Sequence, residues 1–213
     1  MTGRLEACIR LAKKVGLKDK IILDVGCSDG WFCKVAEESG AKEIYAIEPD
    51  SEKIKIAKSI APRAKIKKGV AGKLDFPRIF DMVSLFDVIE HVPKNSEPQV
   101  LMQINKVLKK GGYLLISTPF DYWLSKLTDA AWYFGHRHYS KEKLERFLNK
   151  EGFKIKQFST HGGFWEASAM WVLYISKWIF HTKMPFEEWF DIRRRKEFKR
   201  KGKMEILLIA QKT

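Results

Sequence analysis

The chain has 213 residues, 45% of them apolar, and this length suits one domain with a sizeable core better than two small domains. It carries 40 Lys and Arg against 26 Asp and Glu, a formal charge of +14; this favours anionic partners such as nucleic acid, an acidic membrane or a phosphorylated substrate, although it also serves solubility alone. Three cysteines exclude a disulfide framework, and since the first residues hold no unbroken apolar run, we expect a cytoplasmic protein without a signal peptide.

Helix and strand patterns alternate along most of the chain. A first helix is expected within residues 1–18, and Ser51 is the expected N-cap of a later helix that ends before Pro62. The other helices are expected at residues 31–40, 98–112 and 140–153, and the strands at residues 20–26, 43–49, 64–70, 80–86, 113–119, 154–160 and 204–213.

This alternation is typical of βαβ units and of a parallel sheet covered by helices on both faces. Right-handed crossovers place a ligand crevice at the carboxyl ends of the strands, where the strand order reverses. We therefore expect a single α/β domain over residues 1–213. Residues 162–203 interrupt the rhythm and form an insertion between the sixth and seventh strands.

The segment from Ile22 to Phe32, ILDVGCSDGWF, contains the pattern G-x-S-x-G, which in α/β-hydrolases forms the turn that exposes a nucleophilic serine. That turn needs an oxyanion hole built partly by an earlier strand–helix loop, and here only a helix precedes the first strand. Neither Ser28 nor Cys27 has a base in the local sequence. We therefore predict that both are small residues that fit a tight turn.

A cofactor site explains the same segment better. Asp24 ends the first strand, and Gly26 and Gly30 let the backbone turn tightly into a helix whose N-terminal amides point to the crevice. Glu48 ends the second strand, where a carboxylate can accept both ribose hydroxyls of a nucleoside. The G-x-G-x-x-G of dinucleotide sites is absent, and Asp24 would repel a pyrophosphate. S-Adenosylmethionine, which carries an ammonium and a sulfonium group and no phosphate, therefore fits better than NAD.

Four motifs in order resemble those of class I S-adenosylmethionine-dependent methyltransferases, in the broad group that includes the ubiquinone-biosynthesis type. They are LDVGCSDG, AIEPD, FDMVSLFDVIEHVP and LKKGGYLLISTP, and HRHYSKEKLERFLNKEGFKI resembles the family's late helix and sixth strand. The resemblance covers about residues 19–160 and 203–213. It implies a Rossmann-like, seven-stranded, mostly parallel sheet with an antiparallel last strand, S-adenosylmethionine as cofactor and S-adenosylhomocysteine as product.

The resemblance also assigns cofactor contacts by position. The methionine end would lie against Asp24, Gly26, Cys27 and Gly30, the ribose against Glu48, the adenine against Pro49, and the sulfonium region against Leu85 and Phe86. Where the family commonly has an Asp that accepts a hydrogen bond from the adenine, this chain has Val70. Backbone groups of Val70 and Ala71 are then the expected adenine contacts.

Methyl transfer from a sulfonium needs no metal, because the leaving group is neutral, but a general base helps when the acceptor is a hydroxyl. Four side chains are candidates for that base: His91, His136, His138 and Tyr139. His91 equally fits a packing or capping role after the fourth strand. His136 and His138 have a spacing that metals use, but no further ligands cluster beside them in the sequence, so we expect no metal.

Residues 162–203 have an apolar, tryptophan-rich first half, and residues 193–203 contain eight Lys or Arg and one Glu. Glu166 and Lys177 leave too short an apolar stretch for a membrane span. The segment fits a lid over the acceptor pocket, an interfacial helix on an anionic membrane, a dimer interface or a solvated basic tail. RNA is an alternative to an anionic membrane as the partner of these basic residues, although the sequence contains no RNA-recognition motif.

Together these patterns predict an S-adenosylmethionine-dependent methyltransferase that acts on a small, hydrophobic or lipid-linked acceptor and makes peripheral contact with an anionic membrane. Two alternatives stay open: an RNA or protein methyltransferase, and a cofactor-binding module without activity. The sequence does not predict the acceptor, the methylated atom or the oligomeric state.

Overall fold

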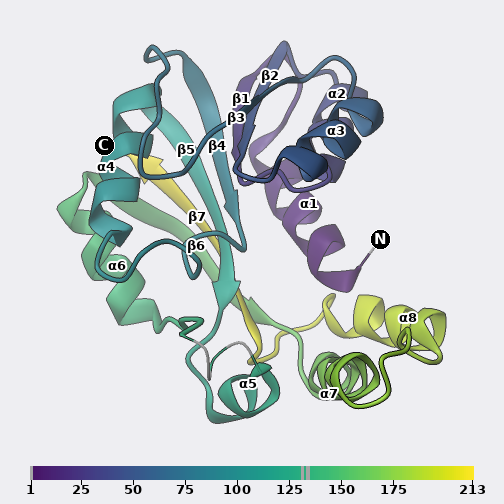
Figure 1. The fold of residues 1–213 in the computed structure, drawn as a ribbon. Helices are drawn as coiled ribbons and strands as arrows, with labels where there is room; N and C mark the ends of the chain where they lie inside the picture. The colour runs from purple at the N-terminus through teal and green to yellow at the C-terminus, as the bar shows by residue number, and fades with distance from the viewer. Residues whose placement is uncertain (1, 131, 133–134) are drawn as a thin grey trace.

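The computed structural model describes residues 2–130, 132 and 135–213. A seven-stranded sheet forms its centre, and helices cover both faces of the sheet (Figure 1). The strands are β1 (Ile21–Val25), β2 (Glu43–Glu48), β3 (Lys65–Lys68), β4 (Phe80–Phe86), β5 (Leu108–Pro119), β6 (Phe153–His161) and β7 (Glu205–Lys212). The helices are α1 (Gly3–Val15), α2 (Trp31–Glu38), α3 (Ser51–Ile60), α4 (Glu97–Val107), α5 (Trp123–Thr128), α6 (Lys141–Lys150), α7 (Phe164–Trp178) and α8 (Glu187–Glu197).

The strand order is β3-β2-β1-β4-β5-β7-β6. Strands β1 to β5 pair in parallel, whereas β7 lies antiparallel between β5 and β6. The predicted Rossmann-like sheet with an antiparallel last strand is therefore confirmed. Because the strand order reverses between β1 and β4, the carboxyl ends of these two strands flank the crevice in which this fold class binds ligands.

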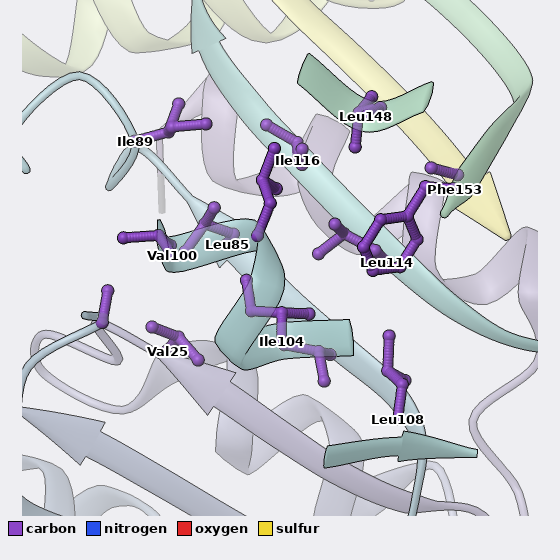
Figure 2. Close-up of a cluster of buried hydrophobic side chains, with 14 of the residues drawn as sticks. Val25, Leu85, Ile89, Val100, Ile104, Leu108, Leu114, Ile116, Leu148 and Phe153 are labelled. Atoms are coloured by element: carbon purple, nitrogen blue, oxygen red, sulfur yellow. The ribbon is translucent and has the colours of Figure 1, made fainter. Parts of the chain in front are cut away.

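Two apolar cores, one on each face of the sheet, hold the layers together. On one face, Leu85 and Leu114 from the sheet lie against Ile104 of α4 and Leu148 of α6, and all four side chains are fully buried (Figure 2). On the other face α1, α2 and α3 pack against the sheet with many small side chains, such as Ala57. A parallel sheet that is covered on both faces needs strands with apolar residues on both sides, which is why these strands are nearly continuous apolar runs.

The helix expected at residues 98–112 is shorter in the structure. It is α4, which ends at Val107. Leu108 then pairs with Phe80 of β4 and begins β5, and the pairing register shifts between Phe80 and Met82. The expected helix end is therefore wrong, because pairing with the neighbouring strand draws the basic stretch after Leu108 into the sheet.

The N-cap of α3 also differs from the expectation by one residue. Asp50 is the N-cap, and its carboxylate accepts hydrogen bonds from the N–H groups of Glu52 (2.8 Å) and Lys53 (3.4 Å). Ser51 is the first residue of the helix. Aspartate and serine are both favoured at this position, so the choice depends on where the backbone leaves the extended conformation.

Residues 162–203, which we call the cap, form a hairpin of α7 and α8. Together with α5, the cap lies beyond the carboxyl ends of the parallel strands, near the start of α1 (Figure 1). The backbones of α1 and α8 approach closely, since a Cβ added to Gly3 would lie 2.8 Å from the carbonyl carbon of Arg194. Among the residues that the structure describes, none of the helices is long and apolar enough to cross a membrane.

The junction between the cap and β7 provides a test of this packing. A Cβ on Gly202 would lie 1.8 Å from the carbonyl oxygen of Gly162. We expect Gly202→Ala to lower the free energy of unfolding by about 2 kcal/mol or more, because the two backbones must separate. The control is Gly72→Ala, where the nearest atom to the new Cβ is 3.9 Å away, and it should change that free energy by less than about 0.5 kcal/mol. Chemical denaturation measures both, and equal stabilities would contradict the packing.

Candidate active site

A glycine turn connects β1 to α2 and faces the crevice. Gly26 and Gly30 have φ angles of +77° and +80°, a region that favours glycine. A Cβ would lie 2.5 Å from a methyl carbon of Val88 at the first position and 2.9 Å from the Cα of Ala57 at the second. The N–H of Gly26 donates to the carbonyl oxygen of Ile47 (2.8 Å), which fixes the turn to β2. Backbone geometry therefore requires both glycines.

Asp24 lies at the base of this turn and is 3% exposed. Its Oδ1 accepts a hydrogen bond from the Ser84 hydroxyl (2.6 Å), and its Oδ2 accepts one from the Cys33 thiol (3.5 Å). Burial raises the pKa of Asp24 to about 6, and the two hydrogen bonds oppose this only in part. A cationic ligand group would stabilise the ionised form of this buried carboxyl.

Glu48 ends β2 beside the same turn. Its Oε2 accepts a hydrogen bond from the N–H of Ser28 (2.9 Å), and its Oε1 accepts one from the N–H of Asp50 (3.2 Å). These bonds fix the carboxylate, and each oxygen has a second lone pair with which it can accept from a ligand hydroxyl. Pro49 follows on the surface.

A cavity of about 180 Å³, which we call the turn cavity, opens at the carboxyl ends of β1 and β4. Four residues that were predicted to bind the cofactor line it: Asp24, Gly26, Cys27 and Phe86. Other lining residues were not predicted, and several come from the start of α1: Thr2, Arg4, Leu5, Cys8, Ser28, Asp29, Trp31, Phe32 and Asp87. No local sequence signal connects α1 with this cavity, whereas Asp87 directly follows a predicted residue.

Two predicted cofactor residues point their side chains elsewhere. Leu85 is fully buried in the core on the α4 face, because side chains alternate along β4 and Phe86 takes the crevice side. Ala71 is 8% exposed and belongs to the same core, while its neighbour Val70 is 56% exposed. The side chains of Leu85 and Ala71 are therefore core side chains, so only backbone groups remain there for a cofactor contact, and that contact stays a prediction at both positions.

A second cavity of about 210 Å³, which we call the histidine cavity, lies between α5, α7 and the adjoining ends of β5 and β7. Three predicted candidates for the base line it together: His91, His136 and His138. It also contains three carboxyl groups that the sequence patterns did not single out: Asp129, Glu166 and Glu205. The structure thus joins residues from five separate parts of the chain.

One carboxylate organises the imidazoles. Oδ2 of Asp129 is hydrogen-bonded to Nδ1 of His136 and, at 2.9 Å, to Nε2 of His138. Burial acts to raise the pKa of Asp129, but the bonds to both imidazoles outweigh it and hold that pKa well below its usual value. The ring of His91 lies over that of His136, with centroids 4.5 Å apart, and burial together with the neighbouring His136 lowers the pKa of His91.

Nε2 of His136 and Oε1 of Glu90 are both buried, and neither has a hydrogen-bond partner among the residues that the structure describes. They lie 3.9 Å apart, and Glu90 is 2% exposed. Burial, with the nearby charge of Asp87, raises the pKa of Glu90 well above its usual value. Since buried polar atoms are nearly always hydrogen-bonded, this pair marks a point at which a ligand group can bind.

Contrary to the expectation from the sequence, further side chains that could bind a metal do cluster beside His136 and His138. Each of two groups brings three ligand atoms within 4.8 Å of one another: Glu90, His91 and His136, and Asp129, His136 and His138. In the second group the hydrogen bonds to Asp129 already account for the closeness of the rings. That the site uses no metal stays a prediction.

Tyr139, the fourth candidate for a base, is fully buried in the core. Its hydroxyl donates to the carbonyl oxygen of Ile89 (3.0 Å), and Oε1 of Glu97 and Nε of Arg137 also lie 3.0 Å from it. Burial raises the pKa of this hydroxyl well above its usual value. We therefore correct Tyr139 from a candidate base to a residue that links the loop before α6 to the segment after β4.

Arg4 lines both cavities. Its guanidinium lies 3.2 Å from Asp87, 3.1 Å from Glu166 and 3.4 Å from Glu205. Arg194 of α8 pairs with the same Glu166 at 2.5 Å. The side chain of Arg4 is thus a shared wall between the two cavities, and it is held by ion pairs to β4, α7 and β7.

A family model described as a methyltransferase domain matches residues 4–157. The chain belongs to this family. The match covers every residue of the glycine turn, Glu48 and the three cavity histidines, but it ends before the cap.

Relatives of this methyltransferase domain carry several names. A protein of Mycolicibacterium smegmatis named a probable S-adenosylmethionine-dependent methyltransferase is 27% identical over 69% of this chain and 56% of its own length. A ubiquinone biosynthesis O-methyltransferase of Vibrio atlanticus is 30% identical over 51% of this chain and 47% of its own. A tRNA U34 carboxymethyltransferase of Helicobacter acinonychis is 29% identical over 48% and 41%. The chain spans about half the length of the curated relatives it matches.

Solved structures support the fold of the methyltransferase domain over nearly its whole length. An S-adenosylmethionine-dependent methyltransferase from Mesorhizobium loti superposes with a TM-score of 0.67, at 18% identity, over 99% of this chain and 98% of its own. The [4+2]-cyclase SpnF gives a TM-score of 0.68, at 18% identity, over 99% and 81%. Since one of these two is named a cyclase, the fold alone does not fix the reaction.

The residues of the turn cavity fit S-adenosylmethionine. The glycine positions leave room that a Cβ would fill, and the buried carboxyl of Asp24 suits a cationic group. Asp29 and Asp87 add two further carboxyls to the same cavity, and among the described residues its one cationic side chain is Arg4, which pairs with Asp87. Such a cavity disfavours a phosphate-bearing cofactor and favours one with an ammonium and a sulfonium.

The raised pKa of Asp24 generates a prediction. An acid whose pKa is about 6 in the folded state and near 3.8 in the unfolded state binds its proton more tightly when folded, so it contributes less stability as the pH rises from 3.8 through 6. Asp24→Asn should therefore stabilise the ligand-free protein at pH 7.5, by up to about 3 kcal/mol, and should weaken S-adenosylhomocysteine binding by about 2 kcal/mol or more.

Calorimetry at pH 5 and pH 7.5 measures both effects. Asp19→Asn, in an exposed turn, is the matched control and should change neither quantity. An Asp24→Asn variant that binds S-adenosylhomocysteine as tightly as the native protein would remove Asp24 from the site.

Proposed function

We propose that this chain transfers a methyl group from S-adenosylmethionine to a hydroxyl group of a small, hydrophobic or lipid-linked acceptor. One observation carries the proposal: the imidazole of His136 is oriented by Asp129, its Nε2 has no hydrogen-bond partner among the described residues, and its cavity shares Arg4 with the turn cavity. An oriented imidazole with a free nitrogen beside the methyl donor is suited to accept a hydroxyl proton.

The roles of the residues follow from their contacts. When bound, S-adenosylmethionine supplies an electrophilic methyl group on a sulfonium; Asp24 would hold its ammonium and Glu48 its ribose. Asp129 accepts a hydrogen bond from Nδ1–H of His136, which leaves the lone pair of Nε2 for the acceptor hydroxyl. His91, whose ring centroid lies 4.5 Å from that of the same ring at an interplanar angle of 33°, would restrict its rotation.

An apolar groove next to the histidine cavity supports a hydrophobic acceptor. It has a volume of about 410 Å³ and lies between α5 and α7, where Leu127, Trp171, Ile175 and Trp178 line it. Thr128 and Tyr174 line both the groove and the histidine cavity, so the two spaces are continuous. A polar head in the cavity and an apolar chain in the groove would bury the chain away from water, at roughly 25 cal/mol per Å² of apolar surface.

RNA methylation is the second candidate. The basic residues at the end of α8 favour it, and one relative is named a tRNA-modifying enzyme. The structure offers no specific observation for a protein acceptor. A cofactor-binding module without methyl transfer is the alternative from another class, and the cyclase among the structural neighbours is the reason to keep it.

Transfer of a labelled methyl group to fractionated cell extracts tests the proposal. We expect label in a lipid-soluble fraction, and we expect His136→Asn to reduce transfer by about a hundredfold or more without changing S-adenosylhomocysteine affinity, because only the base is lost. The control Lys58→Gln alters an exposed residue of α3, away from both cavities, and should be silent. Label confined to RNA, or full activity of His136→Asn, would contradict the proposal.

We also propose that the turn between α7 and α8 contacts an anionic membrane surface. Ile179, Phe180 and Phe186 are 66%, 66% and 78% exposed, and Lys177 and Lys183 flank them. Exposed apolar side chains gathered at one end of a hairpin are typical of an interaction surface, and neighbouring lysines add attraction to anionic headgroups.

Flotation with vesicles tests the membrane contact. Binding to phosphatidylglycerol vesicles should exceed binding to phosphatidylcholine vesicles and weaken in high salt. Phe180→Asp/Phe186→Asp should abolish it, whereas Ile56→Asp, which places one charge at an exposed apolar position of α3, should not. Equal flotation of the double variant would contradict the contact, and self-association that the double variant abolishes would replace it with a dimer interface.

A further inference from the structure

We call the turn between α7 and α8, with its exposed Ile179, Phe180 and Phe186, the aromatic turn. A basic groove of about 550 Å³ lies at the opposite end of the cap from this turn. It is bounded by the start of α7, the end of α8, the segment that leads into β7, and Tyr122 and Leu124 next to α5. Five cationic side chains line it: Arg193, Lys196, Arg200, Lys201 and Lys203. Nothing in the cofactor site or in the histidine cavity accounts for this concentration of charge.

The cations of this groove are not neutralised by the protein. Within residues 2–130, 132 and 135–213, none of the five has a carboxylate at ion-pair distance, whereas their neighbour Arg194 pairs with Glu166 and Asp191. The single acid of the lining, Glu197, accepts hydrogen bonds from the backbone N–H groups of Trp165 (3.0 Å) and Glu166 (2.9 Å). Since Glu197 serves as the N-terminal cap of α7, the groove keeps an excess of positive charge.

Two of these cations, Arg193 and Lys203, lie over aromatic rings. The guanidinium of Arg193 lies 3.4 Å from the ring centre of Trp189 and 5.1 Å from that of Trp165, and the ammonium of Lys203 lies 4.9 Å from that of Tyr122. Aromatic faces orient cations in this way without neutralising them. The five cationic side chains of the groove repel one another, and among the described residues none of them has a carboxylate at ion-pair distance. An anionic ligand bound in the groove would reduce that repulsion.

The backbone fixes the two lysines at the rim. The N–H of Lys203 donates to the carbonyl oxygen of Gly162 (2.9 Å), and the N–H of Gly202 donates to that of Thr160 (2.8 Å). The backbone of Lys201 forms an isolated antiparallel β-bridge with that of His161. The close approach of the two glycines therefore sets Lys201 and Lys203 on either side of a rigid crossing point.

The groove is next to the proposed reaction site. Met204 lines both the groove and the histidine cavity, and it directly follows Lys203. A ligand whose anionic group occupies the groove can therefore extend past Met204 into the histidine cavity. The apolar groove adjoins the other side of that cavity through Thr128 and Tyr174.

We propose that the basic groove binds a terminal phosphate or diphosphate group carried by the methyl acceptor. This inference rests on the proposed function and specifies its substrate class: a phosphorylated amphipathic molecule with a hydroxyl group. Phosphate carries more charge than a carboxylate and accepts hydrogen bonds from several cations at once. A concave site favours a compact group over a flat membrane, and α7, with its 15 residues, separates the groove from the aromatic turn by about 20 Å.

The experiment measures binding of inorganic diphosphate by calorimetry and by phosphorus NMR. Lys201→Gln/Lys203→Gln should raise the dissociation constant at least about tenfold, because two charge-assisted contacts are lost. Lys53→Gln/Lys58→Gln removes the same charge from exposed positions on α3 and should change the constant less than about twofold. S-Adenosylhomocysteine affinity should be unchanged in both variants, which shows that each one folds.

A second arm identifies the source of the phosphate. The extracts used for labelled methyl transfer are treated with a phosphatase before the reaction. Loss of label after this treatment, together with reduced labelling by the Lys201→Gln/Lys203→Gln variant, would support a phosphorylated acceptor. Label that resists both the phosphatase and the variant would overturn the inference.

Two further outcomes would also overturn it. One is the absence of diphosphate binding at millimolar concentration, and the other is equal weakening in the α3 control. Binding of phosphatidylglycerol vesicles or short RNA that is lost in the groove variant, without diphosphate binding, would assign the groove to a macromolecular surface. These results can be told apart from a failure of the proposed function. If the proposed function is wrong, no methyl group is transferred to a lipid-soluble acceptor, whether or not diphosphate binds to the groove.

Discussion

The site depends on one cation, Arg4, and on the three carboxyl groups around it. Asp87, Glu166 and Glu205 come from the ends of β4, α7 and β7, and without Arg4 three acids would lie together in a largely dry place. Burial raises the pKa of Glu205 well above its usual value, and the nearby guanidinium of Arg4 opposes this rise. Arg4 thereby holds the start of α1 against both cavities and fixes the distance between them.

The sheet could be predicted from the sequence because each strand and helix carries a local pattern. The predictions were wrong where the local structure depends on contacts with residues far away in the sequence. The stretch after Leu108 is compatible with a helix until Phe80 offers it a strand partner, and the short helix α5 has no pattern of its own but packs against α7. Leu85 and Phe86 are adjacent in β4, so their side chains point to opposite faces of the sheet: Leu85 lies in the core and Phe86 lines the turn cavity. Which of the two faces the core depends on how β4 is placed between its neighbouring strands, and the local sequence does not contain that information.

The glycine turn could be predicted from the sequence more completely than the histidine cavity. The turn from Asp24 to Gly30 is local, so its chemistry is visible in a short quoted segment. The histidine cavity is assembled by tertiary contacts: His136 and His138 were visible as candidates, but Asp129, seven residues before His136, had no motif, and Glu205 lies on the last strand. Tyr139 belonged to the same motif, and only its burial shows that it faces the core.

The cap is the part of the chain in which specificity can reside. The family match covers residues 4–157, which hold α1 to α6, β1 to β5 and most of β6, and it ends before the cap. Glu166 is 1% exposed and pairs with both Arg4 and Arg194, so one buried acid fixes α7 to α1 and to α8. This buried network does not include the three proposed binding surfaces, because neither the residues that line the apolar groove and the basic groove nor Ile179, Phe180 and Phe186 form an ion pair with Glu166. Substitutions at those surfaces are therefore expected to change ligand binding while the ion pairs still hold α7 to α1 and α8.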